Sequence, residues 1–381
     1  MSGVYIHIPF CKQSCHYCNF HFSTSLKYKQ ELIDSLIKEI SITSLFANEE
    51  IANQQNKTIN TIYIGGGTPS ILNINELEAI FNSLHKKFII AADAEITLEA
   101  NPDDITTAKL YDWKAIGINR LSVGVQSFND EELRWMNRAH NAADSIKCID
   151  EIIIAGFINF SIDLIYGSPL LSDIEWKKNV DILFEKKVPH ISCYALTVEP
   201  KTALDKMIQL HKSILVDPEK QATQFLLLMQ WMQQAGYEHY EISNYALPGM
   251  RSKHNSSYWT GEKYYGFGPS AHSFDGKNRQ WNIANNAAYI QSLQNNIIPF
   301  EEEILSPVQH LNEYIMTSLR TIEGLNHAKI EDVFGGKYRE KLLIKSKKYL
   351  STDKLVESGE VLQLTTEGKL FADGIAADLF F

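Results

Sequence analysis

Short runs of β-branched and aromatic residues alternate with longer amphipathic stretches over the first 235 residues of the chain. A short apolar run predicts a buried strand, whereas apolar residues spaced three or four apart predict a helix. The six expected strands are 4–8, 61–64, 95–99, 120–125, 159–166 and 190–196. The expected helices are 28–46, 76–88, 107–116, 130–137, 142–155, 174–186 and 218–235. Strands joined by helical crossovers pair in parallel, so the predicted fold class is α/β.

Six such units are fewer than the eight that close a TIM barrel. We therefore expect an open, TIM-like partial (β/α)6 barrel over residues 1–235, with a doubly wound sheet as the alternative. Residues 236–306 form a connecting region rich in glycine, aromatic residues and histidine. Residues 307–381 are predicted to form a small helical domain with a hairpin at 355–364, similar to a winged helix.

Composition narrows the class of protein. The chain is 44% hydrophobic and 22% charged, which is typical of a soluble globular protein. Its net charge is -10 and it has no basic stretch, so we expect no nucleic-acid partner. No apolar run approaches 18 residues, and the first residues do not resemble a signal peptide. The expected location is the cytoplasm.

Three of the five cysteines, Cys11, Cys15 and Cys18, lie directly after the first predicted strand. An odd number of cysteines in a reducing compartment argues against a disulfide framework. Three thiolates can ligate three irons of a cubane cluster and leave the fourth iron open to a small ligand. A zinc site completed by a nearby histidine, a thioredoxin-like pair of the last two cysteines, and plain structural cysteines are the weaker alternatives.

Chemically distinctive residues follow several other predicted strands, where barrel proteins place their sites. The glycines before Thr68 would let a ligand approach the backbone closely. Glu99 could accept hydrogen bonds from hydroxyl groups at a strand end. Arg138 has the geometry to bind a carboxylate, although by itself it reads as a solvated helix residue. Asp163 lies in a mostly apolar strand and needs a partner if buried.

The Cys-x3-Cys-x2-Cys spacing after the first strand resembles the radical S-adenosylmethionine (radical SAM) superfamily. The segment Tyr-Ile-His-Ile-Pro-Phe-Cys is similar to oxygen-independent coproporphyrinogen III oxidases and their HemW-type relatives. The resemblance implies a barrel of the radical SAM type, a [4Fe–4S] cluster on the three cysteines, and bound S-adenosylmethionine. The positions that it implies around this cofactor are Tyr5, Tyr17, Gly66, Gly67, Thr68, Glu99, Gln126, Arg138 and Asp163.

Four features separate the oxidases from the HemW-type haem chaperones. Phe20 stands where the oxidases carry a further cysteine, and the first strand begins at residue 4, without the extension of the oxidases. Residues 254–259 match the His-Asn-x-x-Tyr-Trp motif of HemW-type proteins, and His272 replaces an apolar residue of the oxidases. The resemblance therefore favours a HemW-type chaperone without oxidase activity.

This resemblance implies haem as a third cofactor and acceptor haem proteins as partners, with contact at the membrane periphery. His254 and His272 are the candidate haem residues, because histidine is a common axial ligand. Taken alone, the His254 segment reads as a loop with satisfied ring nitrogens. The alternative functions are the coproporphyrinogen III oxidase itself and another radical SAM enzyme of porphyrin metabolism.

Overall fold

The computed structural model describes residues 2–44 and 58–381. They divide into two compact units. The first contains Met1–Asp217 and Glu262–Glu303, and the second contains Pro218–Gly261 and Ile304–Phe381. The three-part division expected from the sequence, with boundaries at 235 and 306, stays a prediction.

The first unit is built on six parallel strands that are neighbours in chain order. They are β1 (Ser2–Ile8), β2 (Thr58–Gly66), β3 (Ile89–Ala100), β4 (Arg120–Gln126), β5 (Phe160–Tyr166) and β6 (His190–Ala195). This arrangement confirms the predicted partial (β/α)6 fold. Beyond β1 the sheet continues with β9 (Lys263–Phe267), β10 (His272–Phe274), β11 (Asn278–Asn282) and β12 (Phe300–Ile304). β9 pairs parallel to β1, and β10 and β11 pair antiparallel.

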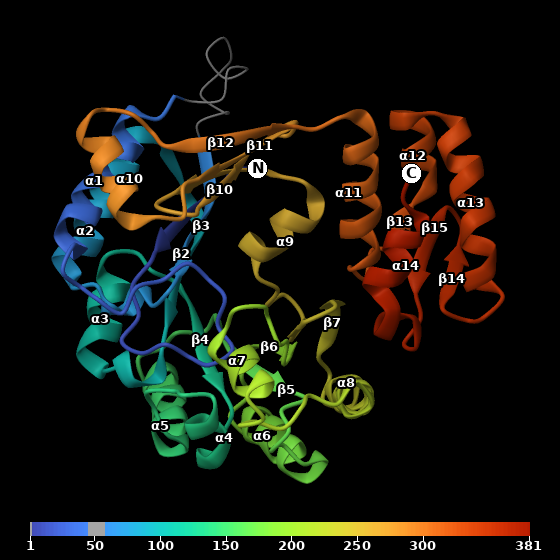
Figure 1. The fold of residues 1–381 in the computed structure, drawn as a ribbon, viewed down its shortest axis with the longest axis horizontal. Helices are drawn as coiled ribbons and strands as arrows, with labels where there is room; N and C mark the ends of the chain where they lie inside the picture. Colours follow the sequence, from blue (N-terminus) through green and yellow to red (C-terminus); the bar gives the residue numbers. More distant parts are fainter. Residues whose placement is uncertain (1, 45–57) are drawn as a thin grey trace. The chain divides into compact units, whose positions relative to one another are not determined.

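Helices connect the parallel strands, as the crossover rule requires. They are α1 (Lys29–Ile42), α2 (Ile74–Lys87), α3 (Thr107–Ala115), α4 (Asp130–Trp135), α5 (Ala142–Ile154) and α6 (Asp173–Glu185). Figure 1 shows α1, α2, α3 and α5 on one side of the strands. The predicted helix 28–46 is shorter in the structure, because Thr43 takes an extended ψ of 127°. Residues 45 and 46 of that prediction lie outside the described residues.

One connection was predicted as a loop but contains a helix. After β6 the chain forms α7 (Ala203–Gln209), whose first turn is capped by the Thr202 side chain. A further helix of this unit, α10 (Asn286–Gln294), precedes β12. The seven residues of α7 are too few for a clear helical period, which explains why the sequence pattern did not reveal it.

The two faces of the parallel strands differ in chemistry. Val4 lies opposite Ile62 on the next strand, and Tyr5 lies opposite Tyr63. Because side chains alternate along a strand, this register places the aliphatic residues on the face beneath the helices and the polar residues on the other. The polar face includes Tyr5, His7, Tyr63, Thr97, Glu99, Arg120, Ser122, Asp163, His190 and Ser192. Burying so many polar groups is costly unless they have partners, so this face is the place to look for a site.

The second unit is mainly helical. It contains α8 (Pro218–Gln234), the hairpin of β7 (Glu238–Glu241) and β8 (Asn244–Ala246), and α9 (Lys253–Thr260). Its remaining helices are α11 (Pro307–Leu319), α12 (His327–Phe334), α13 (Gly336–Leu350) and α14 (Ala372–Leu379). The predicted hairpin is present as β14 (Leu355–Ser358) and β15 (Val361–Leu364), with β13 (Leu325–Asn326) on its other edge. A core around Leu311, Ile315 and Leu362 holds together the four helices α11 to α14 and the strands β13 to β15.

Among the residues that the structure describes, none of the helices combines the length and the apolar character that a membrane span would need.

Candidate functional site

The three clustered cysteines lie on a loop that leaves β1 and returns to it. The backbone N–H of Cys11 donates to the Ser23 carbonyl at 3.0 Å, and the N–H of Ser23 donates to the Pro9 carbonyl at 2.9 Å. These two bonds close the loop at its base. Residues 11–18 are thereby held at the carboxyl end of β1, where the sequence placed them.

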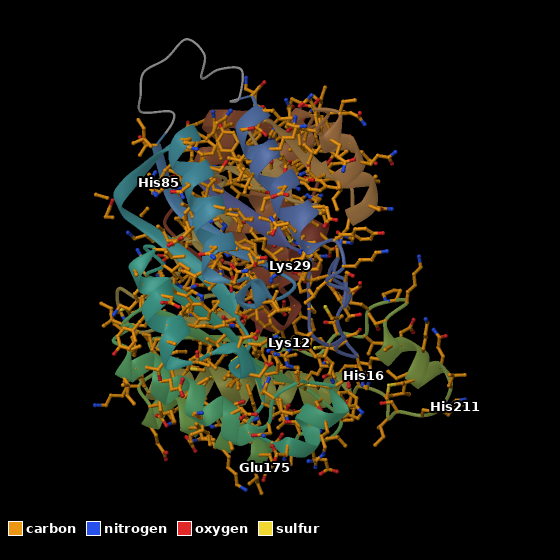
Figure 2. The ribbon with its side chains drawn as sticks, turned by 90° about the vertical axis from the view of Figure 1, so that its left-hand side faces the viewer. Lys12, His16, Lys29, His85, Glu175 and His211 are labelled. Carbon is orange, nitrogen blue, oxygen red and sulfur yellow. The ribbon has the colours of Figure 1, made fainter. Side chains whose placement is uncertain are left out.

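The middle of the loop is held through His16. Its backbone N–H donates to the Met136 carbonyl at 3.1 Å, and the N–H of Leu204 donates to the His16 carbonyl at 2.8 Å. The ring Nδ1 of His16 donates to the Trp135 carbonyl at 2.7 Å, because a carbonyl oxygen can only accept. Figure 2 shows Lys12 and His16 of this loop, well separated from His85 in the last turn of α2. His16 therefore anchors the loop to the end of α4 and to α7.

The thiols of Cys11, Cys15 and Cys18 are half-buried and form no disulfide. Burial raises the pKa of the Cys11 thiol to about 11, and the Thr68 hydroxyl opposes that rise. The guanidinium of Arg138 donates from Nη1 to Cys15 Sγ at 3.3 Å. Thiolates in such a site need a positive partner, which Arg138 supplies in part and bound iron would supply in full.

Three thiols in one loop are the donor set that a cubane cluster requires. Among residues 2–44 and 58–381, no three His, Cys, Asp or Glu side chains converge on one ion position. In a [4Fe–4S] cluster each cysteine ligates a different iron, so the three sulfurs stand apart.

The glycine run at the end of β2 has backbone that a side chain would disturb. Gly66 has a φ of +109°, and a Cβ there would lie 2.7 Å from the ring of His7. A Cβ on Gly67 would lie 2.6 Å from the Phe10 carbonyl and 3.0 Å from Cys11 Sγ. The glycines are therefore required for the backbone of this run to pack against β1 and the cysteine loop.

Glu99 ends β3 directly beside this run. Its Oε1 accepts from the Tyr63 hydroxyl at 2.7 Å, and its Oε2 accepts from the Gly66 N–H at 3.0 Å. Burial and the nearby Asp163 carboxylate together raise the pKa of Glu99 to about 7, against the opposing effect of these two hydrogen bonds. Glu99 is therefore poised between its two charge states near neutral pH.

Arg138 joins three of the strand-end segments. Besides the bond to Cys15, its Nη2 donates to Asn101 Oδ1 at 2.8 Å and to the Gly124 carbonyl at 2.6 Å. Asn101 in turn donates to the Thr68 hydroxyl at 3.2 Å. Asn101 is not among the site residues expected from the sequence, although it follows Glu99 in the Glu-Ala-Asn-Pro segment. The buried Nε of Arg138 has no hydrogen-bond partner among the described residues, so one donor is left for a ligand.

Gln126 and Asp163 complete the set on β4 and β5. Gln126 has a φ of +68°, a left-handed conformation that is strained for a residue with a side chain. Ser122 donates to Asp163 Oδ2 at 3.4 Å, while the buried Asp163 Oδ1 has no partner among the described residues. Burial raises the pKa of Asp163 to about 6, opposed by Ser192 and by the charge of Arg120. A strained backbone and an unused buried acceptor are both typical of a binding site.

Tyr5 lies on β1, and Tyr17 lies between Cys15 and Cys18 in the cysteine loop. The Tyr5 hydroxyl donates to Nδ1 of His7 at 3.2 Å, because Nε2 of His7 donates to the His21 carbonyl at 2.9 Å. Burial lowers the pKa of His7 to about 4, so this ring is neutral. Tyr17 packs against a small core that contains Met136 and Leu204.

The two candidate haem residues lie in different units. His272 starts β10 in the first unit, where its ring is 6.0 Å from that of Trp281. His254 belongs to the second unit and is 1% exposed. Its segment is the helix α9 and not a loop, because Ser252 caps the helix by accepting from the Asn255 N–H. The ring Nε2 of His254 lies 2.9 Å from the Tyr258 hydroxyl, one turn further along.

Comparison with known proteins decides the family. Residues 5–183 match the model of the Radical SAM superfamily, and residues 305–371 match that of the HemN C-terminal domain. The heme chaperone HemW of Bacillus subtilis is 32% identical over 98% of this chain and 98% of its own. The chain belongs to the HemW family. The HemW of Synechocystis is 36% identical over 87% of this chain and 81% of its own.

The fold of this HemW family member also matches a solved structure. Coproporphyrinogen III oxidase (HemN) from Escherichia coli superposes with a TM-score of 0.84 over 100% of this chain and 90% of its own. At 22% identity this likeness concerns the fold. Membership of the radical SAM superfamily implies a [4Fe–4S] cluster and S-adenosylmethionine as cofactors, and the thiols at the end of β1 fit that cluster.

Proposed function

We propose that this protein is a cytoplasmic haem chaperone, which binds haem and delivers it to acceptor haem proteins at the membrane periphery. The main support for this function is the identity of 32% with a heme chaperone HemW over 98% of both chains. Phe20 supports the same conclusion, because a 69% exposed phenylalanine stands where the oxidases have a further cysteine.

In this proposal Cys11, Cys15 and Cys18 hold the cluster, and the polar strand ends hold S-adenosylmethionine. When bound, the cluster supplies a single electron to the sulfonium group. The residues that surround S-adenosylmethionine are Tyr5, Tyr17, Gly66, Gly67, Thr68, Glu99, Gln126, Arg138 and Asp163.

The contacts of these residues suggest individual roles. The free Nε of Arg138 would donate to the ligand's carboxylate, and Oδ1 of Asp163 would accept from an amino or hydroxyl group. Glu99, already bonded to Gly66, would accept from the ribose hydroxyls when ionised. Arg138 also ties the cysteine loop to β4, so the ligand and the thiols would be oriented by one side chain.

His254 and His272 are the proposed haem residues. Nε2 of His254 is engaged with Tyr258, so ligation of iron through this nitrogen would require that hydrogen bond to break. His272 is exposed and needs no such change.

Anaerobic reconstitution of the full chain followed by haem titration tests the proposal. We expect stoichiometric haem binding, weakened by His254→Ala or His272→Ala, and no conversion of coproporphyrinogen III in the presence of S-adenosylmethionine and reductant. Turnover to protoporphyrinogen IX would refute the chaperone function in favour of the oxidase. Unchanged haem affinity in both variants would remove the two histidines as ligands.

A further inference from the structure

A cation–π pair lies at the end of the His254–Trp259 helix. The guanidinium carbon of Arg320 lies 5.4 Å from the ring centroid of Trp259. Trp259 is the last residue of the motif, and Arg320 directly follows α11. Both belong to the second unit, so the contact does not depend on how the two units are placed.

The charge of Arg320 is only partly used within the protein. Among the residues that the structure describes, it forms one ion pair, through Nη1, with Asp373, whose side chain is 74% exposed. An ion pair with so exposed a partner is weak, because water competes for both groups. The Nε of Arg320 is buried and has no hydrogen-bond partner among the described residues. Glu241 is also near this charge: burial raises the pKa of its carboxyl and the charge of Arg320 opposes that rise, while its Oε1 accepts from the Ser243 N–H and from Asn244.

Arg251, in the same unit, differs from Arg320 in how fully its charge is neutralised. It too lies over an aromatic ring, 5.3 Å from the centroid of Tyr240. Its Nε and Nη2 donate to the two carboxylate oxygens of Glu238 at 2.7 Å, and its Nη1 donates to Glu323 at 2.7 Å. Two carboxylates thus neutralise Arg251, whereas Arg320 keeps a donor and a weakly held charge for a ligand.

We propose that Arg320 and Trp259 form the carboxylate-binding end of the haem site. Arg320 would exchange Asp373 for a haem propionate, which it can bind through two parallel N–H donors. The ring of Trp259 would hold the guanidinium plane and contact the porphyrin edge. His254 and Trp259 are five residues apart on α9, which is about 7.5 Å along the helix axis and about 140° around it, so Trp259 and Arg320 lie on another face of α9 than the His254 ring. The inference rests on the proposed binding of haem at this motif.

The experiment compares haem with its dimethyl ester, whose two carboxylates are blocked. Both ligands are titrated into the reconstituted full chain, and dissociation constants are measured for wild type, Arg320→Gln, Arg320→Lys and the matched control Arg251→Gln. We expect Arg320→Gln to weaken haem binding by about tenfold, which is the usual effect of losing a charged hydrogen bond. The diester should bind wild type and Arg320→Gln equally. Lysine should restore only part of the affinity, because it lacks the planar fork.

The controls distinguish a failure of the carboxylate-binding role of Arg320 from a failure of haem binding itself. Arg251→Gln should leave haem affinity unchanged, and Asp373→Asn should strengthen it by about two- to threefold, because a competing surface carboxylate is removed. Equal losses for haem and diester in Arg320→Gln, or no loss, would overturn the carboxylate role while haem binding stands. If wild type binds neither ligand, the proposed function and this inference fail together.

Discussion

The Tyr63 hydroxyl donates to Oε1 of Glu99 at 2.7 Å, across the neighbouring strands β2 and β3. The other oxygen, Oε2, is held by the Gly66 N–H. The carboxyl group is therefore fixed at the glycine run while its burial favours the protonated form. The two hydrogen bonds therefore favour the ionised carboxylate, whereas burial favours the protonated carboxyl group.

Glu99→Gln should stabilise the ligand-free protein at pH 8 and have little effect at pH 5. The pKa of Glu99 is raised from 4.5 to about 7, so the folded chain holds the proton more tightly than the unfolded chain. Stability therefore falls as the pH rises from about 4.5 through about 7. The expected gain at pH 8 is about 2 kcal/mol, measured by urea unfolding. An equal effect of the substitution at both pH values would contradict this account.

The same carboxylate should make S-adenosylmethionine binding depend on pH. If ionised Glu99 accepts from the ribose hydroxyls, affinity should increase as the pH rises through about 7. Isothermal titration from pH 6 to pH 8 measures this trend. In Glu99→Gln the affinity should be lower by about tenfold at pH 8 and the part of the trend near pH 7 should disappear. A wild-type affinity that falls with rising pH would contradict the proposed role.

Gly66→Ala should destabilise the fold more than Gly249→Ala does. The φ of +109° costs about 1–2 kcal/mol for a residue with a Cβ, and the clash with His7 adds to it. Gly249→Ala is the matched control, because Gly249 has a φ of +81° with nothing within 4 Å of its Cβ position. Urea unfolding of both variants separates backbone strain from the clash. If the two variants lose the same free energy of unfolding, the clash with His7 makes no measurable contribution to the destabilisation.

Replacement of Cys11, Cys15 or Cys18 by alanine should abolish cluster binding. Each ligates its own iron in the proposed site, so loss of one thiolate leaves an incomplete cluster. Iron content and visible absorbance after anaerobic reconstitution provide the measurement. Cys148→Ala is the control, because Cys148 is buried in α5 and is expected to retain full iron content. Full iron in any of the three loop variants would exclude that cysteine as a ligand.

Tyr258→Phe should strengthen haem binding if Nε2 of His254 is the ligand. The substitution removes the hydroxyl that lies 2.9 Å from this nitrogen, so ligation no longer has to break that contact. A gain of about fivefold corresponds to one neutral hydrogen bond of about 1 kcal/mol. Haem titration with Tyr258→Phe and His254→Ala side by side tests it. A loss in Tyr258→Phe as large as that in His254→Ala would instead assign a direct role to the tyrosine.

Much of the first unit was predictable because its signals are local. The strands around Val4, Ile62 and Ile162 are short runs of β-branched residues, and the cysteine spacing lies within eight residues. Helix α7 and the helical state of His254 were not predictable in this way. Both helices are short, so a cap such as Ser252 decides them more than any repeating apolar pattern does.

The residues of the site were named from the sequence largely through resemblance, whereas their contacts depend on the fold. Asn101 bridges Thr68 and Arg138, yet an asparagine before a proline reads as an ordinary turn. The orphaned acceptor of Asp163 and the left-handed backbone of Gln126 arise only when β4 and β5 pair.

The alternation of strands and helices and the three clustered cysteines are encoded locally, and they were enough to predict the class of fold and the kind of cofactor. The tertiary structure decided which polar groups meet. Arg138 joins Cys15 to β4, Glu99 is buried against Gly66, and Arg320 lies over Trp259. The physical reason is that burial and pairing depend on neighbours distant in the chain, and these neighbours set the charge and the free hydrogen-bonding capacity of each side chain.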